Sequence, residues 1–481
     1  MIEGLCLLIL LMCGIYSGHR LFLLGIYLYA KHNEKNRPPK YTVSSAPPKI
    51  TIQLPVFNER YVVKRLIDAV CSIRYPRHLL EIQVLDDSDD DTCDILDTLV
   101  ETYRIQGHPI QTVRRGSRTG YKAGALQHGL RSAKGEWILI FDSDFIPQPD
   151  LLESALPYLN DSGLGMIQFC WDHINRNFSL FTRIQALFLD GHFHIEHFSR
   201  NRSGRFFNFN GTAGMWRRSC IIDSGGWQYD TLTEDMDLSY RAQMRGWKFL
   251  YAPDIRVPAE LPVELAAFKS QQFRWAKGSI QTARKILPRL FRSDQPWRIK
   301  IEGGFHMLSN VMYMVLPLMI LVMPFVLGHM SLVQMYLYRT VLMFSLVSIT
   351  AFYLFAGWHP WAGSRIKLLI EIPLLMAVGI GLCVNNSEAV IKGIFSNAAV
   401  FVRTPKYNVV TRKDRWQHNI YRIRRVPLFW MEAFFLAYLV VTMIYSIRLS
   451  ALHMLPYLAI FTTGFAYFVT LNLKQAYSGK G

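Results

Sequence analysis

The sequence predicts an α/β domain with a mostly parallel sheet, set between helices that cross a membrane. Three apolar stretches, at 49–57, 81–87 and 136–144, have the length and composition of buried strands, and helical stretches separate them. This alternation is typical of a parallel sheet. The 481 residues are 51% apolar and still 19% charged, so apolar and soluble segments are segregated along the chain.

Residues 1–30 are predicted to form one transmembrane helix, because nearly all side chains from 2 to 30 are apolar. The alternative is a cleaved signal peptide. The segment has neither a basic start nor a small-residue cleavage site, so we favour a retained helix. Arg20 lies within it, and its side chain either extends toward lipid headgroups or faces a polar interior.

Residues 31–49 are expected to be a basic linker on the cytoplasmic side, since they hold five Lys or Arg residues against one Glu, and four prolines. The formal net charge of +17 gathers in such stretches beside membrane segments, which argues against a nucleic-acid partner. The seven cysteines show no metal-ligand spacing and favour reduced thiols in a cytosolic compartment.

The soluble domain is expected over 50–300. Beyond it we expect transmembrane or interfacial helices over 301–386, a basic cytoplasmic segment over 387–427 and a transmembrane hairpin over 428–481. The apolar segments behind this division lie at about 305–327, 332–356, 366–386, 428–446 and 451–472.

The basic stretch 388–425 limits how these segments cross the membrane. It carries nine Lys or Arg residues against two acidic residues and should lie inside. If the domain lies on the same side, an even number of crossings separates the two, and the first two apolar segments already supply that number. The segment 366–386 is then interfacial or re-entrant, or it pairs with the apolar run 389–402.

The motif FDSD places Asp142 and Asp144 directly after a predicted strand. Two carboxylates with one spacer suit a hard cation, Mg²⁺ or Mn²⁺, that bridges to phosphate oxygens. Ligands of parallel sheets bind at the carboxyl ends of the strands. A solvated turn is the alternative for an isolated Asp-x-Asp, but the neighbouring motifs favour a metal and diphosphate site.

An earlier strand ends in LDDSDDD (85–91). Asp86 and Asp87 are placed to accept hydrogen bonds from the base and ribose of a nucleoside. Ser88 or Asp89 can in addition cap the helix that follows.

Two later motifs carry groups suited to sugar chemistry. In TEDMD (233–237), Glu234 and Asp235 offer a carboxylate that can accept the proton of an attacking sugar hydroxyl. The motif QQFRW places Gln271, Arg274 and Trp275 on a predicted helix. The arginine can pair with a phosphate, and the tryptophan either stacks on a sugar ring or packs in the core.

Seven motifs in order, within 50–285, together resemble glycosyltransferase family 2. More closely, they look like the cellulose-synthase-like processive β-glycan synthases, nearest the mannan/glucomannan synthase branch and its bacterial relatives. One membrane helix before the domain and several after it also fit those synthases. The motifs are LPVFNE (54–59), LDDSDDDT (85–92), GYKAGAL (120–126), FDSDF (141–145), FNGTAGMWR (209–217), TEDMDL (233–238) and QQFRW (271–275).

The resemblance implies a Rossmann-like GT-A fold for the cytosolic domain, a nucleotide-diphospho-sugar donor and inverting transfer. It also implies nucleoside contacts for Asp86 and Asp87 and a donor contact for Lys122. By the same resemblance, Asp142 and Asp144 would bind the metal and the diphosphate, and Asp235 would be the general base with Glu234 beside it. Acceptor and diphosphate contacts would come from Gln271, Arg274 and Trp275.

The segment FVRTPK (401–406) is similar to the gating loop of cellulose synthases, where a Phe-x-x-Thr-x-Lys segment covers the nucleotide. Phe401, Thr404 and Lys406 are the matching residues. The alternative is a basic stretch that binds lipid headgroups. Plant mannan synthases typically have His where Phe273 stands, and their gating segment reads differently, so the resemblance leaves the exact sugar open.

We therefore expect an integral protein of the inner or plasma membrane, with its catalytic domain in the cytoplasm. It would transfer a hexose from GDP-mannose or UDP-glucose to a growing β-linked polysaccharide and secrete the product. Expected partners are the donor, a glycan acceptor and membrane lipids. The alternative is a non-processive transferase with a lipid acceptor. A transporter with a nucleotide-binding domain has little support, because no Walker A motif occurs and TEDMD and QQFRW would have no role.

Overall fold

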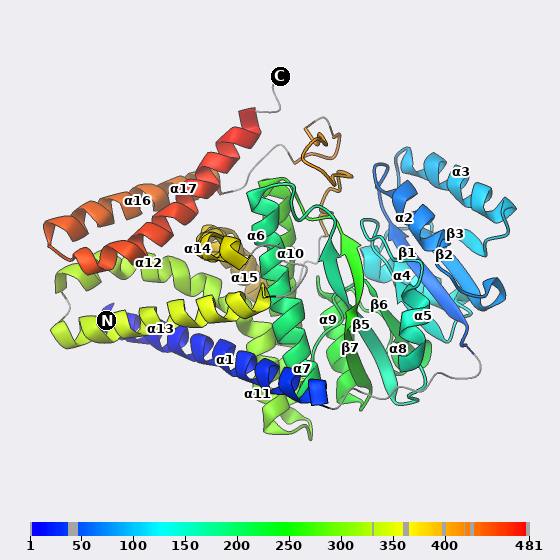
Figure 1. The fold of residues 1–481 in the computed structure, drawn as a ribbon, viewed down its shortest axis with the longest axis horizontal. Helices are drawn as coiled ribbons and strands as arrows, with labels where there is room; N and C mark the ends of the chain where they lie inside the picture. The colour runs from blue at the N-terminus through cyan, green and yellow to red at the C-terminus, as the bar shows by residue number, and fades with distance from the viewer. Residues whose placement is uncertain are drawn as a thin grey trace.

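Long helices form one half of the molecule and an α/β domain forms the other (Figure 1). The computed structural model describes residues 2–36, 47–329, 331–358, 365–396, 401–417, 419–423 and 428–477.

A seven-stranded sheet lies at the centre of the domain, in the order β3–β2–β1–β4–β6–β5–β7. Strand β1 pairs in parallel with β2 and β4, while β6 runs antiparallel to β4 and β5. The predicted, mostly parallel sheet is confirmed, with one reversed strand. The strands are β1 (Ile50–Val56), β2 (Leu80–Asp86), β3 (Ile110–Arg114), β4 (Trp137–Ile140), β5 (Leu164–His173), β6 (Gly214–Arg217) and β7 (Lys248–Ala259).

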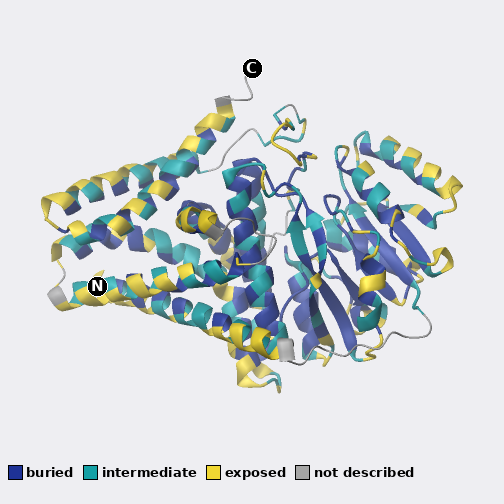
Figure 2. Cartoon of the chain, viewed as in Figure 1, coloured by how far each residue is buried: buried dark blue, intermediate teal, exposed yellow. Residues whose placement is uncertain are grey.

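Helices cover both faces of this sheet. Strand side chains alternate between the faces, so Trp137 and Leu139 of β4 pack with the first helix layer, and Ile138 and Ile140 with the second. Figure 2 shows the strands buried along most of their length. The first layer holds α2 (Val63–Cys71), α3 (Thr92–Ile105) and α5 (Leu151–Ala155), and the second holds α4 (Tyr121–Ser132), α8 (Arg218–Asp223) and α9 (Glu234–Met244).

Helix α4 lies unusually close to the sheet. A Cβ at Gly129 would lie 2.6 Å from Leu85 Cδ2 and 2.7 Å from Gln53 Nε2, so only glycine permits this approach. Beneath the helix, Gln53 Nε2 of β1 donates to Gln83 Oε1 of β2 at 3.0 Å. The packing fixes the first turn of α4, which carries Lys122, at the carboxyl edge of the sheet.

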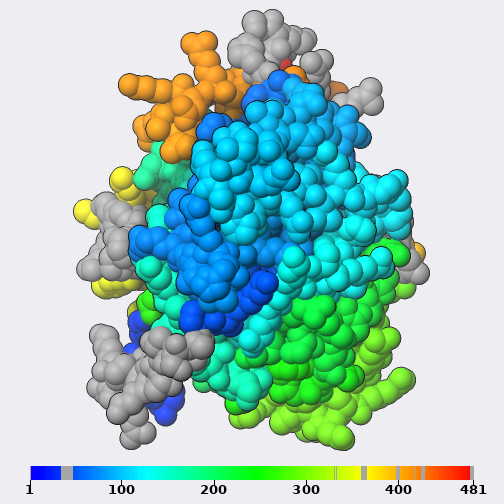
Figure 3. Space-filling model, turned by 90° about the vertical axis from the view of Figure 1, so that its right-hand side faces the viewer, coloured from blue at the N-terminus to red at the C-terminus, as the bar shows by residue number. Residues whose placement is uncertain are grey.

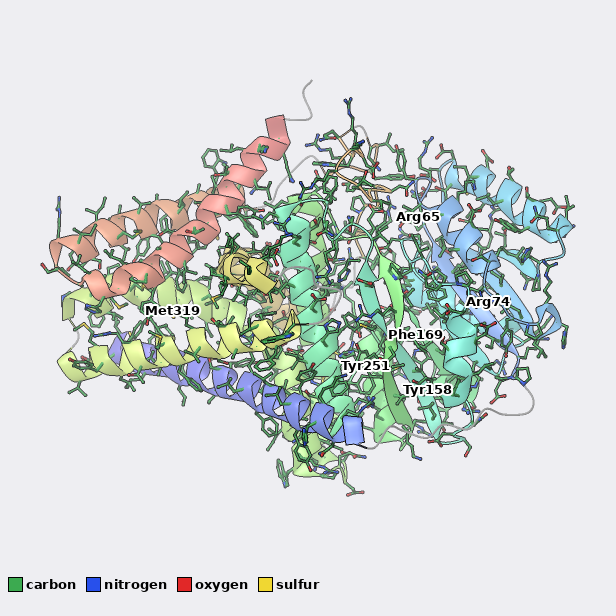
Figure 4. The ribbon with its side chains drawn as sticks, viewed as in Figure 1. Arg65, Arg74, Tyr158, Phe169, Tyr251 and Met319 are labelled. Carbon is green, nitrogen blue, oxygen red and sulfur yellow. The ribbon has the colours of Figure 1, made fainter. Side chains whose placement is uncertain are left out.

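Further helices connect the domain to the helical half and build that half. Figure 4 labels Phe169 and Tyr251 within the sheet layer and Met319 within the helix bundle, and all three side chains are buried. The helices are α1 (Ile2–Asn36), α6 (Leu180–Asp190), a π-helical segment (Gly191–His197), α7 (Phe198–Arg202), α10 (Leu265–Arg292), α11 (Trp297–Leu308), α12 (Met312–His329), α13 (Leu332–Ala356), α14 (Arg365–Gly381), α15 (Cys383–Phe395), α16 (Phe429–Arg448) and α17 (Leu455–Tyr477), and short 3₁₀ turns lie at Arg77–Leu79, Leu156–Tyr158, Ser309–Val311 and Leu452–Met454.

Five helical stretches in the described part of the chain are long and apolar enough to cross a membrane. Helix α1 continues to Asn36, so the first residues of the expected basic linker are helical, and 37–46 lie outside the described residues. Arg20 faces the interior of the bundle, with its guanidinium 5.4 Å from the ring centre of Phe352. The five stretches are Ile2–Asn33, Trp297–His329, Val333–Ala356, Phe429–Arg448 and Leu452–Ala476.

Helices α14 and α15 form a pair bent by 46° at a short break. In Figure 1, α14 is seen nearly end-on, while α1, α13, α16 and α17 run across the view, so its axis crosses theirs. After α15 the chain returns to the domain, because Lys406 Nζ lies 2.6 Å from Asp144 Oδ2. Figure 3 shows this segment, in orange, at the edge of the domain surface. If α12 and α13 both cross a membrane, α14 begins on the same side as the domain. The contact of Lys406 with Asp144 then places the end of the bent pair on that side again.

A buried ion pair ties α10 to the C-terminal helices. Lys269 Nζ lies 2.5 Å from Glu432 Oε1, and Asn472 donates to Glu432 Oε2 at 3.0 Å. Both charged side chains are at most 1% exposed. A buried charge that loses its partner is costly because it can neither be solvated nor neutralised locally.

We predict that Lys269→Met destabilises the protein by about 3–5 kcal/mol, while Lys269→Met combined with Glu432→Leu recovers most of that loss. Thermal unfolding of the detergent-solubilised protein measures both. The exposed pair Arg74–Glu153 is the control, with Arg74 labelled in Figure 4, and Arg74→Ala should leave the melting temperature unchanged. A single Lys269 variant that melts like wild type would contradict the prediction.

Candidate active site

A cavity of about 730 Å³ begins at the carboxyl edge of the sheet and continues among the long apolar helices. Strands β1, β2 and β4 end at this edge, and α4, α9 and α10 surround it. Domain residues that line the cavity include Asp87, Lys122, Asp142, Asp144, Glu234 and Asp235, and the helical half contributes Tyr16, Leu316, Leu346, Gly379 and Phe461 among others.

The two aspartates that follow β4 face lysine side chains. Lys122 Nζ lies 2.5 Å from Asp142 Oδ1, and Lys406 Nζ lies 2.6 Å from Asp144 Oδ2. The backbone N–H of Asp142 donates to Thr212 Oγ1 at 2.8 Å, which fixes the turn. Each carboxylate thus holds a cationic group at hydrogen-bond distance.

Asp144 retains coordination capacity. Its Oδ1 is buried and has no hydrogen-bond partner among the described residues. The described part of the chain contains no group of three or more His, Cys, Asp or Glu residues arranged to hold a metal ion. A divalent cation held by Asp142 and Asp144 would therefore need further oxygens from a ligand such as a diphosphate.

The expected nucleoside contacts, Asp86 and Asp87, are paired with arginines. Arg114 Nε donates to Asp86 Oδ2 at 2.8 Å, and Asp86 is buried. Arg115 holds both oxygens of Asp87, at 2.7 and 2.5 Å, and Asp87 lines the cavity. A ligand that binds Asp87 would share the carboxylate with this guanidinium.

The suggested helix caps at Ser88 and Asp89 do not form. Helix α3 begins at Thr92, and its backbone N–H donates to Asp90 Oδ1 at 2.9 Å. Ser88 Oγ instead accepts from the backbone N–H of Asn58, because the end of β1 lies beside this turn.

Glu234 and Asp235 begin α9, where the helix dipole favours negative charge. Asp235 Oδ1 accepts from the backbone N–H of Met236 at 2.8 Å. A Cβ at Gly211 would lie 3.2 Å from Asp235 Oδ2, so the FNGTAG loop lies directly against the carboxylate. Burial, reinforced by the charge of Glu234, raises the pKa of Asp235 to about 8. A carboxylate with this pKa is suited to accept a proton near neutral pH.

The QQFRW motif lies on α10, and Gln271, Arg274 and Trp275 all line the cavity. Trp275 is half-buried and presents part of its surface to the cavity. Arg274 donates to the backbone carbonyl of Val402, and its guanidinium lies 4.8 Å from the ring centre of Phe401.

The FVRTPK segment lies over the same cavity, and Phe401, Thr404 and Lys406 all line it. Thr404 is 4% exposed, and its buried Oγ1 has no hydrogen-bond partner within the described ranges. Beyond the segment, Tyr407 Oη donates to Glu264 Oε2 at 2.6 Å, and Arg65 Nη1 donates to Asn408 Oδ1 at 2.7 Å. Arg65 is labelled in Figure 4. The segment is thus anchored on the domain.

Sequence reasoning missed the contacts that several cavity residues make with one another. Arg403 Nη1 lies 2.7 Å from Glu59 Oε2, and burial, partly offset by Arg403, raises the pKa of Glu59 to about 7. Arg118 lies 3.2 Å above the ring centre of Phe57. Glu59 and Phe57 belong to the LPVFNE motif, which was found as a pattern, but their partners come from distant parts of the chain.

These features define the GT-A class of glycosyltransferase domains: a mostly parallel sheet between two helix layers, with an Asp-x-Asp pair at the end of a strand and a cavity at the same edge. Residues 47–278 match the family model described as glycosyltransferase like family 2, and the domain they form belongs to that family.

Plant proteins are similar over this region. The chain is 42% identical over 244 residues to probable glucomannan 4-beta-mannosyltransferase 7 of Oryza sativa subsp. japonica, which covers 50% of this chain and 42% of that protein. It is 41% identical over 257 residues to glucomannan 4-beta-mannosyltransferase 2 of Arabidopsis thaliana, covering 52% of this chain and 48% of that protein. The chain thus spans about half the length of the curated relatives it matches.

A solved structure shares the fold. It is the mannosyltransferase PcManGT from Pyrobaculum calidifontis, in complex with GDP-Man and Mn²⁺. The TM-score is 0.55 at 19% sequence identity, and the match covers 82% of this chain and 99% of that one.

We predict that the Asp235 carboxyl loses its proton as the pH rises through about 8, because burial and Glu234 both disfavour the charged form. Infrared difference spectra between wild type and Asp235→Asn should show a protonated carboxyl band that disappears with this midpoint. In Glu234→Gln the midpoint should fall, since one neighbouring charge is removed. A band already lost at the ordinary pKa of an aspartate, about 3.9, would contradict the prediction.

Proposed function

We propose that the protein is an inverting hexosyltransferase that moves mannose or glucose from GDP-mannose or UDP-glucose onto a growing β-linked polysaccharide. The observation that carries this proposal is the single cavity that joins the aspartates of the strand edge to the membrane helices. A polymer extended at Asp235 would leave the site along this cavity, between α1, α12, α13, α14 and α17.

The donor is assigned to the strand edge. The relatives are named glucomannan 4-beta-mannosyltransferases, and the solved structure with the same fold is a complex with GDP-Man and Mn²⁺. GDP-mannose is therefore the first donor to test. Asp87 and the Arg118–Phe57 pair would hold the nucleoside, with Asp86 keeping the turn in place through Arg114. Lys122 and Arg274 would contact the diphosphate.

Asp142 and Asp144 would hold a Mg²⁺ or Mn²⁺ ion, which would supply positive charge to the departing diphosphate. Lys122 and Lys406 already lie on these carboxylates and would turn toward the phosphates. Burial would lower the pKa of Lys122, but Asp142 and Glu234 outweigh it and raise that pKa, so Lys122 stays charged.

Asp235 would take the proton of the acceptor hydroxyl as that oxygen attacks the anomeric carbon and the bond to the diphosphate breaks. Glu234 lies beside it and tunes its pKa. Gln271 and Trp275 would hold the acceptor end from α10, the tryptophan by stacking on a sugar ring.

The catalytic domain is assigned to the cytoplasmic side. In this proposal the nucleotide-sugar donor is a cytoplasmic molecule. The basic segment that contacts the domain after α15 also carries the positive charge that is expected on the cytoplasmic side of a membrane. Its residues Phe401, Thr404 and Lys406 would cover the donor and exclude water, so that the acceptor hydroxyl attacks the donor.

We predict that Asp235→Asn lowers transfer by about 10²–10⁴-fold, because an amide keeps the shape of the carboxylate but accepts no proton. In wild type, kcat/KM should rise with pH toward about 8, since only the ionised carboxylate is active. Released nucleotide and product length, with GDP-mannose and UDP-glucose as donors, measure both. GDP affinity within a few-fold of wild type is the control, and near-normal turnover of the variant would exclude Asp235 as the base. A single glycolipid product would favour the lipid-acceptor alternative.

We predict that Asp144→Ala weakens divalent-cation binding at least 10-fold in the presence of GDP, because it removes the buried oxygen that lacks a partner. The electron paramagnetic resonance spectrum of Mn²⁺ reports this binding without turnover. Asp161→Ala, at an exposed aspartate paired with Lys248, is the control. Full transfer activity in excess EDTA would overturn the metal assignment.

We predict that Thr404→Ala and Lys406→Ala strongly reduce synthesis and leave membrane insertion intact. Lys413→Ala removes the same charge from an exposed position of the same segment and should be close to wild type. Added GDP should protect the wild-type segment from proteolysis. If the stretch only binds headgroups, Thr404→Ala will be silent and activity will follow lipid charge.

A further inference from the structure

The π-helical segment Gly191–His197 lies between α6 and α7, and the three helical elements follow one another without a break. Such turns are rare and occur frequently at functional sites. Two of its side chains, His192 and Glu196, line the cavity. Its first residue must be small, because a Cβ at Gly191 would lie 2.7 Å from Tyr353 Cε1 of α13. The segment therefore occupies a fixed position between the sheet domain and a membrane helix.

His192 connects this segment to the loop beside the proposed base. Asn210 Nδ2 lies 2.9 Å from His192 Nε2, so with the amide as the donor the ring nitrogen accepts. The next residue, Gly211, is the one that lies against Asp235. Asn210 Oδ1 is buried and has no hydrogen-bond partner within the described part of the chain. A polar ligand that reaches Asp235 along the cavity thus passes an unpaired acceptor and an imidazole.

Glu196 presents a charged acceptor to the same space. Its Oε2 lies 3.3 Å from His192 Nδ1 and 3.2 Å from Arg200 Nη1, whereas no described residue donates to Oε1. The side chain is 30% exposed. Burial alone would raise the pKa of Glu196, but Arg200 and His192 outweigh it and hold the pKa well below its ordinary value.

The surroundings of this pair match a neutral sugar. Arg200 and Arg205 together balance the charges of Glu196 and Glu302, so a ligand gains hydrogen bonds without needing a charge of its own. Tyr16 and Ser17 of α1 line the same cavity and offer an aromatic ring and a hydroxyl. Sugar rings bind to aromatic faces with their hydroxyl groups bonded to side chains of this kind.

We propose that Glu196 and Asn210, held in place by His192 between them, form a subsite that binds hydroxyl groups of the acceptor glycan beside Asp235. The inference rests on the proposed function and adds to it the residues that hold the acceptor behind its reacting end. Arg200 and His192 are positioning residues, because Arg200 fixes Glu196 and His192 contacts both Glu196 and Asn210.

A purely structural role is the competing explanation, since Arg200 also binds Glu302, at 3.0 Å, and so ties α7 to α11. Glu302 distinguishes the two explanations. It belongs to the same ionic cluster and accepts from His19 at 3.0 Å, but it is not among the described residues that line the cavity. Its replacement disturbs the cluster without touching the subsite.

The experiment compares Glu196→Ala, Glu196→Gln, His192→Leu and Glu302→Gln in lipid nanodiscs, with β-1,4-linked mannotetraose and cellotetraose as acceptors and GDP-mannose and UDP-glucose as donors. We expect the acceptor KM to rise at least 10-fold in Glu196→Ala and His192→Leu, with shorter products. Glu196→Gln should recover part of the loss, because its amide oxygen still accepts. Glu302→Gln should lower the melting temperature and keep the wild-type acceptor KM.

Unchanged GDP affinity, measured by calorimetry, will show that each variant is folded. An acceptor KM that stays at the wild-type value in Glu196→Ala and His192→Leu would overturn the subsite while the transferase stands. An equal rise of the acceptor KM in Glu302→Gln would also overturn the subsite. A wild-type protein that transfers neither sugar would overturn the proposed function and this inference with it.

Discussion

The structure depends on the compensation of buried negative charge at one edge of the sheet. Asp142, Asp144, Glu234 and Asp235 converge there because the strands end there and α9 begins there. Carboxylates brought together in a poorly solvated cavity repel one another unless cations lie between them. The chain supplies those cations from α4 through Lys122 and from the segment after α15 through Lys406.

This requirement explains why the helical half and the domain are one functional unit. Lys406 reaches Asp144 only because α14 and α15 bend and return the chain to the domain. The same segment brings Arg403 to Glu59 and Tyr407 to Glu264. In the proposed function a cation and a diphosphate would replace one set of opposite charges by another, and the carboxylates would stay compensated with and without the ligand.

The cavity has two kinds of wall, and each follows from the element that builds it. At the strand edge the wall is ionic, because strand ends and helix starts carry the acidic motifs. Among the long apolar helices it is mainly aliphatic and aromatic, with residues such as Leu316, Met376 and Phe461, and a few hydroxyl groups such as those of Tyr313 and Ser345. The π-helical segment lies where the two meet, and its His192 and Glu196 are the polar groups that the acidic motifs do not account for.

The sequence by itself determined β1, β2 and β4 of the seven strands, the position of the acidic pairs and the number of long apolar helices, because these follow from strand length and segment composition. It placed Asp142, Asp144 and Asp235 in one site through motif order. It left open where Arg20 points and whether 366–386 crosses, and it did not reveal that Arg114 and Arg115 hold Asp86 and Asp87. Only the tertiary structure decided that Lys406 meets Asp144 and that His192 meets Asn210. Those pairs depend on how a bent helix pair and a π-helical turn direct side chains across the cavity, and no local pattern encodes such a direction.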